Sequence, residues 1–172
     1  MNQFGNGSWV DSVKLSLPEH AKFLETSLDI AMNQHSLTEI DAHCCALAAA
    51  ISAGNGELAF EISVNGPLFG TDVREQVTQN VMSISLDRVY AEYIEATFKA
   101  GVSNPPYKLA KLDSEIETNG ALYALAAALV LGNSRLSFLL VELLKDNGYT
   151  AEQIQDVAHI AMVVSTINKV II

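Results

Sequence analysis

The strongest constraint in this sequence is an internal repeat. Residues 46–55 read ALAAAISAGN, and residues 124–133 read ALAAALVLGN, 78 positions later. The two copies stay in register without a gap for at least 25 residues, because the same offset aligns Leu58 with Leu136, Phe60 with Phe138 and Gly70 with Gly148. Two copies are too few for a solenoid, which needs about three or more repeats to bury a continuous core. The sequence therefore predicts two similar helical halves that pack face to face.

The length of the chain fits one domain built from these halves. A chain of 172 residues buries roughly two thirds of the surface that it exposes when unfolded. We place the halves at about residues 13–100 and 107–172 of a single domain, 1–172. The segment GVSNPP at residues 101–106 separates them, since Asn-Pro and Pro-Pro exclude helix.

Composition narrows the class of protein. The chain is 49% hydrophobic and 17% charged. It is therefore more apolar than most monomers of its size, which predicts that part of its surface lies in a subunit interface. A net charge of −10 argues against binding nucleic acid, whose phosphates need a basic face, and weakly against anionic membranes.

The chain offers no sign of export or of membrane insertion. Its first residues, MNQFGNG, have neither a basic region nor an apolar stretch, and its most apolar run, residues 121–131, is far shorter than the ~20 residues that span a bilayer. The adjacent Cys44 and Cys45 form no disulfide framework. We expect a cytoplasmic protein.

Each copy is expected to hold three helices. An Ala-rich helix ends at a Gly-Asn break, a second helix ends at Gly70 or Gly148 in the left-handed conformation, and a third helix covers residues 72–100 or 151–172. Capping boxes are predicted at residues 36–39, 114–117 and 150–153. The alanine methyl groups let helices approach closely, so the two Ala-rich helices are expected to cross at the centre.

Several features together resemble a known family. The segment LPEHAK at residues 17–22, the Ala-rich helix ahead of a glycine, the Asn-Pro-Pro turn and the segment GYT at residues 148–150 resemble the alkylhydroperoxidase D family, within the carboxymuconolactone decarboxylase superfamily. The likeness runs from about Val13 to Val170. It implies an all-helical, internally duplicated protein that assembles as a trimer. Members reduce a peroxiredoxin or peroxides through a Cys-x-x-Cys pair, assisted by a glutamate and a histidine.

The chain lacks those functional residues at the matching positions. We use Gly148 to fix the register. The family's two cysteines then fall on Asn133 and Leu136, and the histidine between them falls on Arg135. The later histidine falls on Leu140 and the glutamate on Ala121, so that only Gly132 and Ser134 fit the family's pattern. A dithiol reductase needs a low-pKa thiolate and a resolving thiol one helical turn away. The resemblance therefore implies the helical fold of the family without its dithiol chemistry.

The first copy does not replace the missing thiols in an obvious way. Its matching stretch, residues 54–58, has neither Cys nor His, and the nearest candidates are His43, Cys44 and Cys45 within the Ala-rich helix. Adjacent helical residues point about 100° apart with Cα atoms ~3.8 Å from each other, which is below the usual range for a disulfide. We interpret the two cysteines as small buried residues. The alternatives are that one of them is a redox-sensing thiol or that both bind a metal.

The histidines do not predict a metal site. His35, Glu39 and His43 would share a helical face, but Ser36 as an N-cap would leave His35 outside the helix and occupy Glu39. His159 is interpreted as a core or interface residue. We expect no cofactor and no metal.

The sequence leaves two hypotheses for the function. The first is a non-catalytic paralogue that assembles subunits, as a homo-oligomer, or binds a partner such as a peroxiredoxin or a related reductase. The alternative is an antioxidant enzyme whose altered site uses Ser134, Arg135 and one of the cysteines. The first predicts buried, unreactive thiols, and the second predicts an open polar cavity near Arg135 with a titratable group in it.

Overall fold

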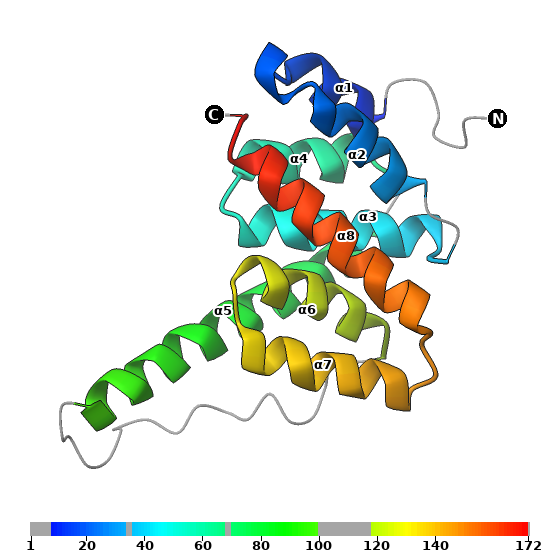
Figure 1. Cartoon of the computed structure of the whole chain (residues 1–172). Helices are drawn as coiled ribbons and strands as arrows, with labels where there is room; N and C mark the ends of the chain where they lie inside the picture. Colours follow the sequence, from blue (N-terminus) through cyan, green and yellow to red (C-terminus); the bar gives the residue numbers. More distant parts are fainter. Residues whose placement is uncertain (1–7, 34–35, 68–69, 100–117, 172) are drawn as a thin grey trace.

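The computed structural model describes residues 8–33, 36–67, 70–99 and 118–171, and within them the chain is helical throughout, with no strand. The expected all-α class is confirmed. The described residues form eight α-helices and a 3₁₀ turn at residues 19–21, and Figure 1 shows how the helices are arranged. The helices are α1 (Trp9–Ser16), α2 (Phe23–Met32), α3 (Glu39–Ser52), α4 (Gly56–Asn65), α5 (Thr71–Lys99), α6 (Thr118–Val130), α7 (Ser134–Asp146) and α8 (Ala151–Asn168). None of these helices is both long and apolar enough to cross a membrane.

The two Ala-rich helices, α3 and α6, pack against each other at the centre of the fold, as the sequence predicts. Residues 44–50 of α3 and 121–128 of α6 are all buried. The fully buried alanine methyl groups allow the backbones to approach closely. Helix α8 lies across both central helices and is covered by α2, whereas α5 packs on them from another side.

The ends of α3 and α6 have the same backbone geometry, 78 residues apart. Gly54 and Gly132 have positive φ of 80° and 69°. At both ends two hydrogen bonds close a Schellman motif, in which the residue after the glycine donates to the carbonyl five residues back. That residue, Asn55 or Asn133, then caps the next helix through its side-chain oxygen.

The register changes after these caps, and the predicted role of Gly70 is wrong. Helix α4 already ends at Asn65, and Gly70 is not among the glycines with positive φ, whereas Gly148 is, at 84°. Helices α5 and α8 begin 80 residues apart. This offset aligns the buried Val77, Val81 and Ile84 of α5 with Val157, Ala161 and Val164 of α8. The repeat is therefore gap-free only through α3 and α4.

Helix α3 is capped by a different residue from the one predicted. Thr38, not Ser36, accepts a hydrogen bond from the backbone N–H of Asp41 at 3.1 Å. The Ser36 hydroxyl instead donates to Asp156 of α8, and the Gln153 amide donates to the Ser36 carbonyl at 3.1 Å. Ser36 thus ties the start of α3 to α8.

The other expected turn signals have different outcomes. The capping box at residues 150–153 is confirmed, since Thr150 and Gln153 exchange both hydrogen bonds. The box at residues 114–117 and the Asn-Pro-Pro turn lie outside the described residues.

Candidate functional site

The positions that the sequence resemblance pairs with catalytic residues of the alkylhydroperoxidase D family lie at the start of α7 and in the core. Asn133 is the N-cap of α7, with its side-chain oxygen accepting from the Leu136 backbone N–H at 3.1 Å. Ser134 and Arg135 are exposed, whereas Ala121 and Leu140 are buried. The helix N-terminus that would stabilise a thiolate is therefore occupied by an amide cap.

The two thiols lie in the interior of α3. Cys44 and Cys45 are both 0% exposed and free. Burial raises the pKa of Cys44 to about 12, because the thiolate would lose its hydration, and contact with Tyr123 offsets only part of this effect. Burial likewise raises the pKa of Cys45 well above its usual range. Both thiols are protonated at neutral pH and out of reach of solvent, so neither is a ready nucleophile.

A polar cluster next to Cys44 links the two central helices. The Tyr123 hydroxyl on α6 donates to the Asp41 carboxylate on α3 at 3.0 Å, and the Thr38 hydroxyl donates to its other oxygen at 2.6 Å. Burial raises the pKa of Tyr123, so its phenol keeps the proton that this bond needs. The bond between Asp41 and Tyr123 joins residues that are 82 positions apart in the sequence.

Sequence reasoning missed the Asp41–Tyr123 pair, although one signal was available. Tyr123 is the one polar side chain within the Ala-rich run of α6, and at the 78-residue offset it aligns with Cys45. A polar group at a core position needs a partner, which the neighbouring Ala-rich helix supplies.

His43 is a core residue with a backbone partner. Its ring nitrogen Nδ1 lies 2.8 Å from the Glu39 carbonyl oxygen, and the ring meets Trp9 edge-on with centroids 6.0 Å apart. Burial lowers the pKa of His43, which keeps the imidazole neutral. Within the described part of the chain no three His, Cys, Asp or Glu side chains are grouped to hold a metal, and His35 lies outside it. His159 is half-buried on α8.

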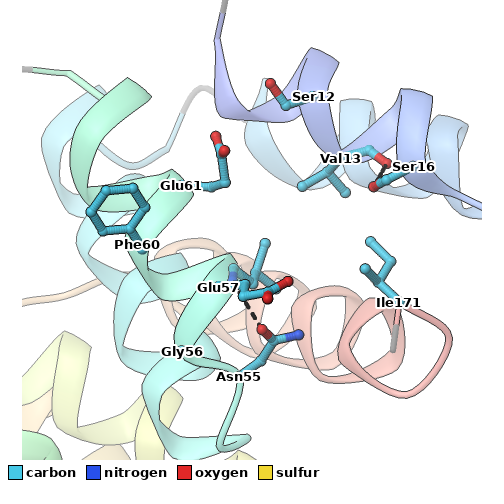
Figure 2. Close-up of a pocket in the computed structure, with 10 residues that line it drawn as sticks. Ser12, Val13, Ser16, Asn55, Gly56, Glu57, Phe60, Glu61 and Ile171 are labelled. Carbon is cyan, nitrogen blue, oxygen red and sulfur yellow. Dashed lines mark hydrogen bonds between the residues drawn. The ribbon is translucent and has the colours of Figure 1, made fainter.

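A cavity of about 440 Å³ opens at a different place, between α1, α4 and the C-terminal end of the chain. Figure 2 shows Ser12 and Ser16 on the α1 side, Glu57 and Glu61 on α4, and Ile171 across from them. The lining also includes Asn55, Gly56 and Leu58, which match Asn133, Ser134 and Leu136 at the 78-residue offset.

The cavity offers binding groups without an activated nucleophile. The Ser16 hydroxyl donates to the Val13 carbonyl at 2.8 Å, and the Asn55 side chain caps α4 by accepting from the Leu58 N–H at 2.9 Å. Its lining contains neither Cys nor His. Arg135, which the enzyme hypothesis places beside an open cavity, does not line this one.

Comparisons with known proteins do not identify the chain. No protein-family model matches it, and no curated protein matches it either.

Proposed function

We propose that this chain is a non-catalytic helical protein of the alkylhydroperoxidase D type, which acts by assembling with copies of itself or with a partner such as a peroxiredoxin or a related reductase. The observation that carries the proposal is the state of its thiols. Cys44 and Cys45 are buried in α3, and burial raises the pKa of both. Thiol chemistry needs an accessible thiolate, which neither residue provides.

The duplicated architecture is supported by backbone geometry. The Schellman motifs that end α3 and α6 and the asparagine caps that follow them use the same hydrogen bonds at the same offset. A repeated local motif of this kind is expected from two copies of one ancestral segment. It supports the two-half organisation inferred from the internal repeat.

The position of the cavity also favours the non-catalytic proposal. An enzyme with an altered site would need a titratable or nucleophilic group in an open pocket near Arg135. The 440 Å³ cavity lies instead at the N-terminus of α4, and its lining combines carboxylates and serine hydroxyls with apolar side chains such as Phe60 and Ile171, without a thiol or an imidazole. Such a lining suits binding better than peroxide reduction.

A peroxide-consumption assay with a dithiol reductant tests this proposal. We expect no turnover above the buffer rate from the natural protein or from the Cys44→Ser/Cys45→Ser variant. Turnover by the natural protein that disappears in the variant would show that the thiol chemistry lies in α3 and would overturn the proposal.

A thiol titration in the folded state provides a second readout. We expect Cys44 and Cys45 to react with an aromatic disulfide reagent only after denaturation. The matched control is a Ser134→Cys variant, in which the new thiol lies at an exposed position of α7 and should react at once. Rapid reaction of the natural protein under native conditions would contradict the proposed burial.

A further inference from the structure

Helix α5 is the longest helix described and projects beyond the rest of the fold (Figure 1). Its 29 residues correspond to a length of about 44 Å. The first half is anchored, because Val77, Val81 and Ile84 are buried where α5 packs on α3 and α6. After Ile84, no described residue of α5 is fully buried.

A second apolar stripe follows the opposite side of the same helix. Met82, Leu86 and Val89 are 65%, 55% and 62% exposed. Residues 82 and 86 each lie two positions from the buried Ile84, a rotation of about 200°, so the stripe faces away from the core. Its spacing of four and then three residues is the a/d spacing of paired helices. Ala96, one heptad beyond Val89, is also exposed.

A projecting helix with such a stripe is unfavourable in an isolated subunit. A helical segment of ~12–15 residues is only marginally stable in water by itself, and contiguous exposed apolar side chains mark an interaction surface. Among the described helices, α5 makes its main contacts with α3 and α6, on the opposite face. The stripe therefore requires a cover from outside these helices.

We propose that the stripe on α5 pairs with the same stripe on a second copy of this chain. An a/d seam is covered best by another helix with the same spacing, which a second copy always supplies. A contact of this kind is isologous, so it closes as a pair and leaves no free edge. The pairing therefore predicts a dimer, which differs from the trimer that the family resemblance implies. The seam is short, since it contains Met82, Leu86 and Val89 with Ala96 beyond them. A short seam predicts a concentration-dependent equilibrium between monomer and dimer.

The charges of α5 permit this pairing in an otherwise acidic protein. From residue 86 to 99 the chain carries three acidic and two basic residues, compared with 17 acidic and 8 basic elsewhere. Within this segment Arg88 pairs with Glu92 at 2.9 Å, and Lys99 pairs with Glu95. Two copies of the segment therefore meet with little net repulsion, whereas the rest of the surface opposes close approach.

The inference rests on the assembly part of the proposed function, for which it names a partner and a surface. It does not depend on the thiols. Peroxide turnover would therefore overturn the non-catalytic proposal without affecting the pairing of α5. A failure of the pairing would likewise leave the non-catalytic proposal unaffected.

Analytical ultracentrifugation over a concentration series tests the pairing. We expect the natural protein to dimerise. Leu86→Lys/Val89→Lys should raise the dissociation constant by about 100-fold or more, since lysines replace two central anchors and face each other across the seam. The matched control is Phe23→Lys/Ile30→Lys, which changes another exposed apolar pair, on α2, and should leave the dimer intact. Circular dichroism checks that each variant keeps its helices.

A mixing experiment distinguishes self-pairing from other contacts. The Leu86→Glu/Val89→Glu variant should be monomeric alone and should form a 1:1 complex with the lysine variant, because opposite charges then meet. Monomeric natural protein at every concentration would overturn the inference and the self-assembly half of the proposed function, whereas the half that concerns a different partner would stand. A natural dimer that survives the lysine substitutions, or a mixture that forms no complex, would overturn only the pairing of α5 with α5.

Discussion

Helices α5 and α8 start with the same pattern and end in different environments. Both begin with buried residues aligned at an offset of 80, and both lie against the central helices. Helix α8 stops after 18 residues and is covered by α2, whereas α5 continues for 29 residues without such a cover among the described helices. The same local pattern therefore yields an internal helix or a projecting one, according to what packs on it.

Helices α3 and α6 differ in another way. Their C-terminal ends are alike in backbone and capping, but their N-terminal halves carry different chemistry. His43, Cys44 and Cys45 of α3 align with Ala121, Leu122 and Tyr123 of α6. A repeated backbone motif thus coexists with polar groups that occur in one copy only, and one of them, Tyr123, donates to Asp41 in the other copy.

The largest difference in the free energy of unfolding is expected between variants in α8 and variants in α5, which are the third helices of the two halves. Ile167→Ala, in the last turns of α8, removes a fully buried side chain and should lower the free energy of unfolding by about 2–5 kcal/mol. Val89→Ala, on the exposed side of α5, should change it by no more than about 0.5 kcal/mol. Urea denaturation of dilute protein measures both values. Similar losses in the two variants would show that the far half of α5 is packed within the subunit.

A smaller effect is expected at the two asparagine caps. Asn55→Ala and Asn133→Ala should each lower the free energy of unfolding by about 0.5–2 kcal/mol, because each leaves a helix N–H without its acceptor. The two losses should agree and should add in the double variant, since the caps lie on different helices and each accepts from its own helix. Thermal and urea unfolding provide the measurement. A loss at one cap only would break the equivalence of the two helix junctions.

The last effect concerns pH and His43, which has an alanine at its matching position in α6. Burial lowers the pKa of His43, so below about pH 6.5 the unfolded chain binds a proton that the folded chain does not. Stability should therefore fall between pH 7 and pH 5, by at most about 1.4 kcal/mol per pH unit.

The His43→Leu variant should have a flatter pH dependence in this range, whatever its overall stability. Urea unfolding at several pH values measures the slope for both proteins. An unchanged slope would mean that other groups cause the acid sensitivity. The carboxylates serve as an internal reference, because their protonation affects stability mainly at lower pH.

Much of the helical layout could be predicted from residues that act locally. The glycines at 54, 132 and 148 terminate helices because a left-handed residue there costs least without a side chain, and Thr150 and Gln153 complete a capping box over four residues. The register after Asn65 could not be predicted. Gly70 aligned with Gly148 in sequence, but the first copy ends its second helix earlier.

The candidate site was predicted less well than the fold. The absence of the family's thiol and histidine pattern from the matching positions was visible in the sequence, as was the improbability of a disulfide between Cys44 and Cys45. The Asp41–Tyr123 bond and the cavity at α4 were not, since each joins residues far apart in the chain. Ser36 shows the same limit, because its hydroxyl reaches Asp156 instead of capping its own helix.

By itself, the sequence determined the all-helical class, the central Ala-rich pair and most helix ends, because hydrogen bonds within a few residues and the period of 3.6 fix these features. The tertiary structure alone decided which apolar faces are covered. Burial is a property of neighbours, and α2 covers α8 while the stripe of α5 stays exposed. The same placement buries both thiols and keeps them protonated, because removing a thiolate from water costs more than this core returns.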